Sequence, residues 1–169
     1  MTQPDSKIQQ ACRDFWQSKK TLVLSTRNAE GKLHSSQTPF AFNDQGELAI
    51  FVSALAEHTG NLLQCIEAES CAISGMILAD EAECEQIYAR ERLSLEMQVA
   101  LVERDDAQFV EWMLRFEKRF GDIIATLQTL PDFSLFRLKV TKAVYVRGFA
   151  QAYLLEGGLG GLPRLQKGR

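Results

Sequence analysis

Three short β-rich runs separated by glycine-containing turns constrain the fold of this chain more than any other feature of its sequence. The runs span residues 21–26, 33–42 and 48–53. Gly31 and Gly46 lie in the two turns, where glycine adopts backbone conformations closed to other residues. Connections this short join neighbouring antiparallel strands. The sequence therefore predicts an antiparallel meander whose second strand is bent or interrupted at Pro39, because proline cannot donate to a strand ladder.

Helical periodicity is strongest after Asp105 and Asp106, which occupy the position of a helix N-cap. Gly121 predicts a break between two helical pieces in this segment. The apolar residues recur every three or four positions, which is typical of a core-facing helix, and they are Phe109, Trp112, Met113, Phe116, Phe120, Ile123, Ile124 and Leu127.

The sequence signal for the remaining elements is weaker. Residues 88–102 are compatible with a long strand or a partly helical segment. The other predicted elements are helices over 5–20 and 57–67, a strand over 70–78, and two closing strands over 133–140 and 143–153. About six strands with helices at the ends of the chain favour an α+β barrel.

The domain organisation follows from the absence of any linker or internal repeat. We expect one domain over residues 1–155. Residues 156–169 begin with a glycine-rich run and end in basic residues, a composition typical of a flexible terminal tail.

Charge and composition disfavour several classes of protein. The net charge of −3 makes a nucleic-acid partner a poor expectation. The sequence has no run of about 18 apolar residues for a membrane span and no apolar segment of a secretory signal near its start, so we expect a cytoplasmic protein without a membrane partner. The four cysteines are scattered without a C-x-x-C pair, which disfavours a metal site and predicts reduced thiols.

Residues capable of acid–base chemistry are few, since the chain has only two histidines, His34 and His58. It contains no motif of a metalloprotease, serine hydrolase, P-loop or dinucleotide-binding protein. The segment 53–63 differs from the rest because it follows a strand and opens a helix. A helix N-terminus presents unpaired N–H groups that suit a phosphate, although a polar helix cap with a solvated histidine explains the same residues.

Three stretches of the chain resemble the flavin-binding split-barrel proteins related to pyridoxamine 5'-phosphate oxidase, and within them the haem iron utilisation branch. The first hairpin over 22–42 includes Ser35, Ser36 and a Thr-Pro-Phe run. The strand-to-helix segment over 51–63 contains an A-x-H-T-x-N-L core. The closing strands over 132–138 and 146–152 complete the likeness.

The resemblance implies a six-stranded antiparallel split β-barrel with flanking helices. It also implies a homodimer with two equivalent ligand sites at the interface. In flavin-binding relatives, the second strand and the following strand-to-helix turn hold the phosphate of flavin mononucleotide (FMN). Carried over to this sequence, the candidate residues are Ser36, Thr38, Ser53, His58, Thr59 and Asn61.

The haem branch implies a different use of the same scaffold. There, a histidine near the C-terminus ligates the iron, and an acidic residue after the long helix lies near it. Asp132 matches the acidic position, although a turn residue after Pro131 explains it equally well. Residues 162–169 contain no histidine, which predicts that the chain does not form the haem complex typical of these relatives.

Three functions remain open at this point. The first is an FMN-binding protein, which as an enzyme would be a flavin-dependent oxidoreductase. The second is a protein that binds or degrades haem. The third is a dimeric module without catalytic activity.

Overall fold

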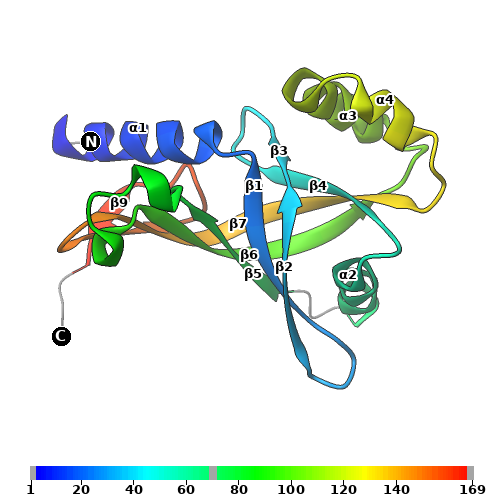
Figure 1. Cartoon of the computed structure of the whole chain (residues 1–169), viewed down its shortest axis with the longest axis horizontal. Coiled ribbons are helices and arrows are strands. Elements are labelled where there is room, and N and C mark those ends of the chain that lie inside the picture. The colour runs from blue at the N-terminus through cyan, green and yellow to red at the C-terminus, as the bar shows by residue number, and fades with distance from the viewer. Residues whose placement is uncertain (1–2, 69–71, 167–169) are drawn as a thin grey trace.

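A computed structural model describes residues 3–68 and 72–166 of the chain (Figure 1). In chain order the helices and strands are α1 (Gln3–Ser18), β1 (Thr21–Arg27), β2 (Leu33–Pro39), β3 (Ala41–Phe42), β4 (Leu48–Ser53), α2 (Glu57–Glu67), β5 (Ala72–Leu78), β6 (Arg92–Val102), α3 (Ala107–Phe120), α4 (Ile123–Gln128), β7 (Phe133–Gly148), β8 (Gln151–Glu156) and β9 (Pro163–Leu165). Two short 3₁₀ turns, Glu81–Glu83 and Ile87–Ala89, lie between β5 and β6.

The strands form one antiparallel sheet in the order β2-β1-β5-β6-β7-β4-β3, and β8 and β9 extend it beyond β7. The two edge strands β2 and β3 are consecutive in the chain, with only the buried Phe40 between them. The sheet therefore curls until its edges approach each other, which makes a split barrel and confirms the predicted α+β class. The described residues hold nine strands rather than six, because Pro39 ends one strand early and because β8 and β9 follow the barrel.

The interruption at Pro39 and the hairpin of β1 and β2 confirm the predictions for this region. The long strand β6 resolves the open choice for residues 88–102. The two closing strands predicted over 133–140 and 143–153 are wrong in their boundaries, since β7 runs without a break from Phe133 to Gly148. The chain turns instead at Phe149 and Ala150, where Ala150 has a φ of 56°.

The residues after 156 contain structure that the sequence did not predict. Leu159 is only 6% exposed and belongs to the core, and β9 pairs with β8. Single apolar residues among glycines carry no periodicity, so composition alone could not reveal either feature.

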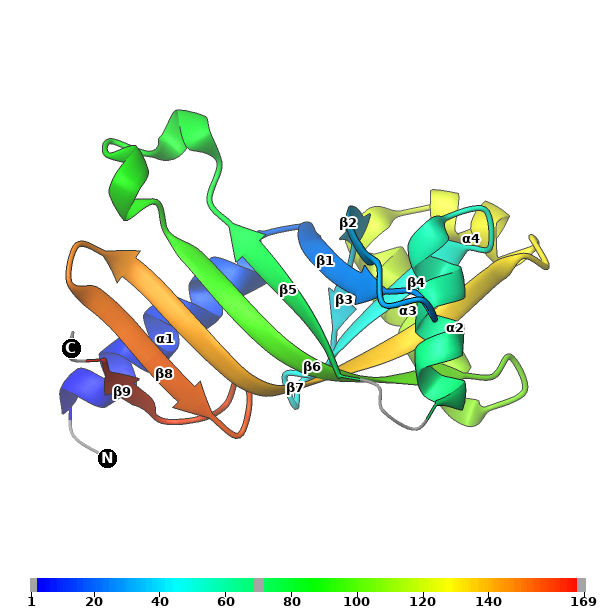
Figure 2. The same ribbon diagram turned by 90° about the horizontal axis from the view of Figure 1, so that it is seen from below.

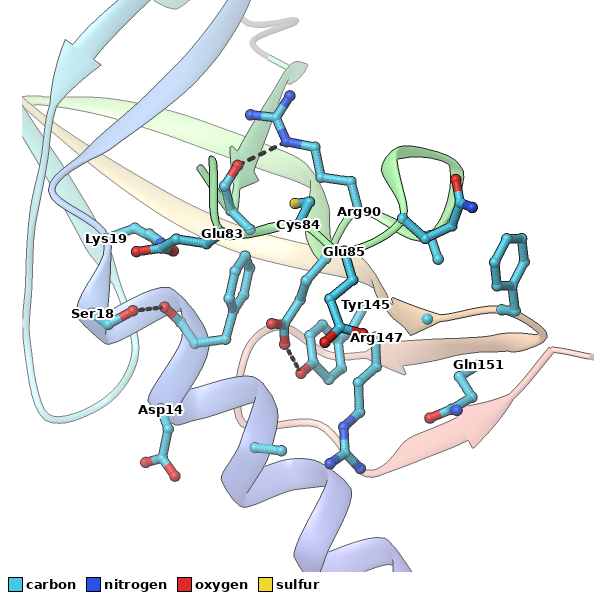
Figure 3. Close-up of a pocket in the computed structure, with 18 residues that line it drawn as sticks. Asp14, Ser18, Lys19, Glu83, Cys84, Glu85, Arg90, Tyr145, Arg147 and Gln151 are labelled. Carbon is cyan, nitrogen blue, oxygen red and sulfur yellow. Dashed lines mark hydrogen bonds and ion pairs between the residues drawn. The ribbon is translucent and has the colours of Figure 1, made fainter. Parts of the chain in front are cut away.

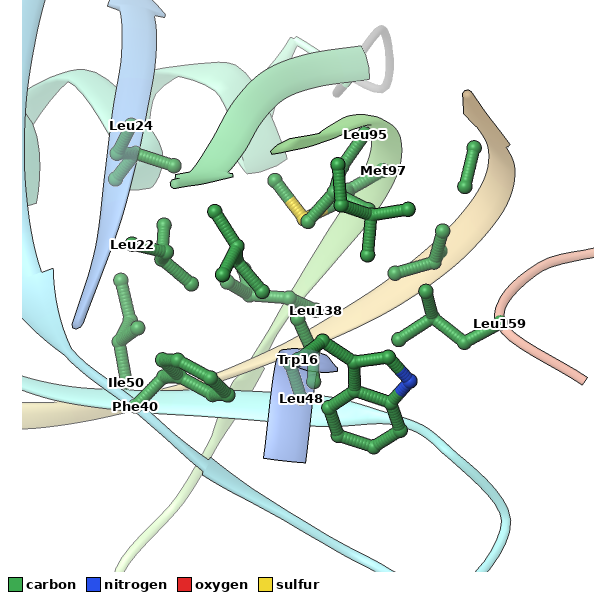
Figure 4. Packing of buried hydrophobic residues seen from close by; sticks show 14 of the residues in the cluster. Trp16, Leu22, Leu24, Phe40, Leu48, Ile50, Leu95, Met97, Leu138 and Leu159 are labelled. Atoms are coloured by element: carbon green, nitrogen blue, oxygen red, sulfur yellow. The ribbon is translucent and has the colours of Figure 1, made fainter. Parts of the chain in front are cut away.

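The main core fills the barrel beneath α1 (Figure 4). Trp16 of α1 packs among Phe40, Leu48, Leu138 and other buried side chains of the sheet. Burying one large apolar side chain of this kind stabilises a fold by about 1.5–3 kcal/mol, so α1 is an integral part of the barrel.

A second core lies under α3 and α4, where Phe109, Trp112, Met113 and Phe116 are buried as the periodicity predicted. The Asp106 carboxylate accepts a hydrogen bond from the Gln108 N–H at 2.8 Å, which confirms the predicted cap. None of the helices in residues 3–68 and 72–166 has the length and hydropathy that crossing a bilayer requires.

Among the cysteines, Cys12 and Cys84 are free thiols, whereas Cys65 is disulfide-bonded. The expectation of four reduced thiols is therefore wrong for Cys65. Cys71 lies outside the described residues.

Candidate functional site

The strand β2 supplies one wall of the candidate site. Its residues alternate in exposure, so His34, Ser36 and Thr38 turn toward the protein while the residues between them face solvent. Thr38 is 2% exposed, and its hydroxyl donates to the Pro39 carbonyl. Successive side chains of a strand point to opposite faces, so this alternation places His34 on the same wall as the two predicted residues.

The start of α2 supplies the facing wall, and Ser53 holds it in place. The Ser53 hydroxyl accepts a hydrogen bond from the Leu55 N–H at 3.1 Å. The Ser53 carbonyl accepts from the Thr59 hydroxyl at 2.6 Å and from the Ala56 N–H at 3.1 Å. Several donors around this helix start are thus already used within the chain, which leaves fewer of them for a phosphate.

Asp132 also helps to fix the start of α2, because it directly precedes β7, the strand that pairs with β4. Its Oδ2 accepts a hydrogen bond from the Ser53 hydroxyl at 2.6 Å, and its carbonyl accepts from the Ala54 N–H at 2.8 Å. The start of β7 and the end of β4 therefore position α2 together.

A cleft of about 870 Å³ runs beside α2, and Asn61 and Thr26 line it. The Asn61 amide donates to the Thr26 hydroxyl at 3.0 Å. Thr26 pairs across the hairpin with His34, and directly opposite residues share one face of a sheet. His58 lies one helical turn before Asn61, on the same face of α2. Both histidines therefore lie near Thr26 and Asn61 at one end of this cleft, although neither histidine is among the residues that line it.

Three buried polar atoms at this end have no hydrogen-bond partner: His34 Nδ1, Ser36 Oγ and His58 Nε2. Buried polar atoms are nearly always paired in native proteins, and a buried unpaired group costs about 1–3 kcal/mol. Such a concentration is typical of a place where a ligand supplies the missing partners.

The ionisable groups near this end of the cleft are the imidazoles of His34 and His58 and the carboxylate of Glu57. His34 Nε2 lies 3.7 Å from Glu57 Oε2. Burial lowers the pKa of His58 below its usual value, and the neighbouring His34 lowers it further, so its imidazole favours the neutral form. In the part of the chain that the structure describes, no lysine or arginine forms a hydrogen bond or ion pair with these residues. Glu57 also adds a negative charge to the helix start, which opposes a phosphate there.

The structure brings the predicted residues to one region and divides them by their contacts. Ser53, Thr59 and Asp132 are hydrogen-bonded to one another or to the backbone, Asn61 is hydrogen-bonded to Thr26, and the buried Thr38 is hydrogen-bonded to the Pro39 carbonyl. Ser36 and His58 keep unpartnered atoms. Prediction from the sequence missed His34, although its alternation with Ser36 and Thr38 on one strand is a signal that could have identified it.

A second cleft of about 880 Å³ lies at the other end of the molecule, between α1, the 3₁₀ turns and the hairpin of β7 and β8 (Figure 3). Tyr145 is fully buried there, and its hydroxyl donates a short hydrogen bond to Glu91. Lys19 and Arg90 on its walls are paired with acidic residues. None of the predicted site residues lines this cleft.

No group of three or more histidine, cysteine, aspartate or glutamate residues within 3–68 and 72–166 is arranged to hold a metal ion. A ligand that brings its own metal needs fewer protein ligands, since haem iron is held by one or two axial side chains.

Comparison with known proteins places the chain among proteins of related architecture. It is 35% identical to the heme oxygenase HutZ of Vibrio cholerae serotype O1 over 151 residues, which cover 89% of this chain and 82% of that protein. A crystal structure of HutZ, described as a heme storage protein, superposes with a TM-score of 0.68 at 36% identity, over 76% of this chain and 87% of that one. The structure of Campylobacter jejuni ChuZ superposes with a TM-score of 0.79 at 29% identity, over 96% of this chain and 67% of that one.

The family model of pyridoxamine 5'-phosphate oxidase matches residues 8–147, which span the barrel from α1 to the end of β7. This match covers most of the chain and agrees with the split barrel that the strand order describes. The chain belongs to the pyridoxamine 5'-phosphate oxidase family.

Proposed function

We propose that this protein binds haem in the cleft beside α2. The observation that carries the proposal is the pair of imidazoles near one end of the cleft, each with a buried nitrogen that has no hydrogen-bond partner. Histidine is a common axial ligand of haem iron. The cleft volume of about 870 Å³ lies within the usual range for cofactor sites.

The lining of the cleft offers both charged and apolar contacts to a ligand, and it includes the carboxylates of Glu30 and Glu96. Its lining contains one positively charged side chain, the exposed Arg27, which can pair with a porphyrin carboxylate. Ile73 and Met97 contribute apolar surface to the same cleft. The name of the V. cholerae relative, at 35% identity over most of both chains, supports the same ligand.

The test is a titration of the purified chain with haem, followed by absorbance. We expect a saturable Soret band with an endpoint of one haem per chain. A linear rise without an endpoint, equal to that of an unrelated protein, would show that the chain has no haem site.

FMN is the second candidate, and two observations favour it. The family model that matches the chain is that of an FMN-dependent oxidase family, and Arg27 in the cleft can pair with a phosphate. Titration with FMN, followed by quenching of flavin fluorescence, tests this candidate. If FMN binds, Arg27→Ala should weaken it by about 10- to 150-fold, since a hydrogen bond to a charged group is worth about 1.5–3 kcal/mol.

We also propose that the chain forms a homodimer through the face of the sheet that carries no helix (Figure 2). A shallow groove of about 360 Å³ on this face is lined by Val23, Met76, Leu78 and Val144. These apolar side chains belong to the three strands β1, β5 and β7, and a second chain would remove them from water.

A further inference from the structure

The described residues of this chain contain both free thiols and a disulfide. Cys12 and Cys84 are free, whereas Cys65 is disulfide-bonded. Disulfides commonly stabilise small secreted domains whose apolar core is too small to hold the fold alone. This chain buries two clusters of apolar side chains and does not depend on such a staple. The disulfide at Cys65 therefore needs an explanation other than the stability of the whole fold.

Cys65 lies on the face of α2 that forms one wall of the cleft. Asn61, Gln64, Cys65 and Ala68 all line this cleft, and their spacing of three and four positions places them on one side of the helix and its C-cap. The first three residues of β5 line the same cleft. Cys65 is half-buried, so a small thiol in the cleft can reach its sulfur. Disulfides that are exposed in this way are the labile and regulatory ones, because exchange requires access of a thiolate to a sulfur.

The second half of α2 has little support apart from this disulfide. The last turn contains no basic residue, and the helix ends at Glu67, whose negative charge opposes the helix dipole. The Gln64 side chain accepts a hydrogen bond from the Ala29 N–H at 3.1 Å, but this bond is exposed to solvent. Leu63 and Ile66 are only partly buried against the main core. Segments with few buried contacts and exposed hydrogen bonds open most readily, so the end of α2 should open once its disulfide is broken.

We propose that the disulfide at Cys65 is a redox-controlled clasp, which holds the second half of α2 as a wall of the cleft when oxidised and releases it when reduced. The reductant is a dithiol. One of its thiolates attacks a sulfur of the protein disulfide to form a mixed disulfide, and its second thiol then displaces the protein. The protein disulfide gains two electrons and two protons to become two thiols, and the dithiol becomes a disulfide. The clasp goes beyond the proposed function, because it does not depend on which ligand occupies the cleft.

The first test counts the thiols. The chain, kept in air or treated with dithiothreitol, is unfolded in guanidinium chloride, alkylated with iodoacetamide and weighed by mass spectrometry. We expect two alkylated cysteines in the first sample and all four in the second. Peptide mapping of the first sample should find Cys65 linked to Cys71, the remaining cysteine of the sequence, which lies outside the described residues. Four alkylated cysteines in both samples would overturn the proposal.

The second test measures the opening of α2 by amide hydrogen exchange. We expect the protection of residues 62–67 to fall about tenfold or more on reduction, since 1.4 kcal/mol of local stability is a factor of ten in an opening equilibrium, while the protection of α3 stays constant. Cys65→Ser should exchange like the reduced parent with or without dithiothreitol. Cys84→Ser removes a free thiol and is the matched control, which should respond to reduction as the parent does. Equal protection of α2 in the oxidised and reduced parent would overturn the clasp.

Titration with haem separates the clasp from the proposed function. Cys65→Ser should bind haem more weakly than the oxidised parent, and Cys84→Ser should bind it equally well, since only the first variant releases a wall of the cleft. If the parent binds no haem, the proposed function fails, and the exchange measurement still decides the clasp. If Cys65→Ser and the parent bind haem equally although their α2 exchange differs, the clasp does not control the cleft and this part of the proposal is overturned.

Discussion

Cys12 lies on the buried side of α1 and is 1% exposed. Burial raises the pKa of its thiol from 9.0 to about 12, and the nearby Glu91 carboxylate adds to the rise. The thiol is therefore neutral in the folded protein over a pH range in which it ionises in the unfolded chain. A group whose pKa is raised by folding contributes stability below its unfolded pKa and loses that contribution as pH rises toward the folded value.

We predict that this linkage is measurable between pH 8 and pH 10. Over that interval the parent should lose about 1 kcal/mol of stability through Cys12 alone, because the folded pKa lies well above the unfolded one. Urea unfolding of the parent and of Cys12→Ala at both pH values measures it, as the change in their difference. Cys84→Ala is the control, and it should retain the pH dependence of the parent. An equal loss in the parent and in Cys12→Ala would contradict the assignment.

At the scale of the element, α2 lies beside the candidate site, but its own sequence contains few features that stabilise a helix. Its N-cap residue is Ala56, which makes no side-chain capping bond, and Gly60 lies within the helix. Both features reduce helix stability. The helix is held instead by the buried Leu62 and by two hydrogen bonds, from Thr59 to the Ser53 carbonyl and from Asn61 to the Thr26 hydroxyl, so tertiary contacts determine its presence.

We predict that Gly60→Ala stabilises the protein by about 0.5–1 kcal/mol, because alanine loses less backbone entropy in a helix than glycine does. A Cβ at this position would meet no atom within 4 Å. Gly75→Ala on β5 is the contrasting variant, since its Cβ would lie 2.8 Å from the Val23 carbonyl oxygen and should destabilise the protein. Chemical unfolding of both variants tests the pair, and a destabilised Gly60→Ala would show that α2 requires glycine there for another reason.

At the scale of the whole molecule, the helices are distributed unevenly. Figures 1 and 2 show α1, α3 and α4 on one side of the curled sheet, and the face formed by β5, β6, β7 and β8 without a covering helix. The half-buried valine, methionine and leucine side chains of this face are the surface that we propose for the homodimer.

We predict that Val144→Glu converts the dimer to a monomer, because it places a charge in an apolar interface. Sedimentation velocity at micromolar concentration should give twice the chain mass for the parent and the chain mass for the variant. Leu114→Glu, at a 61% exposed position of α3, is the control and should remain dimeric. A parent that sediments as a single chain would rule out this dimer.

The sequence by itself determined the elements whose signal is local. The periodicity from Phe109 to Leu127 identified α3 and α4, Asp106 identified the cap, and Pro39 identified the end of β2. The resemblance to the split-barrel family, carried by short motifs in three stretches, identified the fold class and suggested the region of the candidate site. These features depend on residues close together in the chain, so one sequence is enough to reveal them.

Only the tertiary structure decided how these pieces meet. The pairing of Thr26 with His34 and the packing of α2 against that hairpin bring two histidines together that are 24 positions apart in the sequence. The unpartnered nitrogens exist because burial removes water while no neighbouring side chain replaces it. The unbroken course of β7 and the burial of Leu159 also depend on distant strands. Burial and hydrogen-bond pairing are properties of the folded surroundings of a residue, and for this reason the sequence indicated the region of the site but not which of its residues remain available to a ligand.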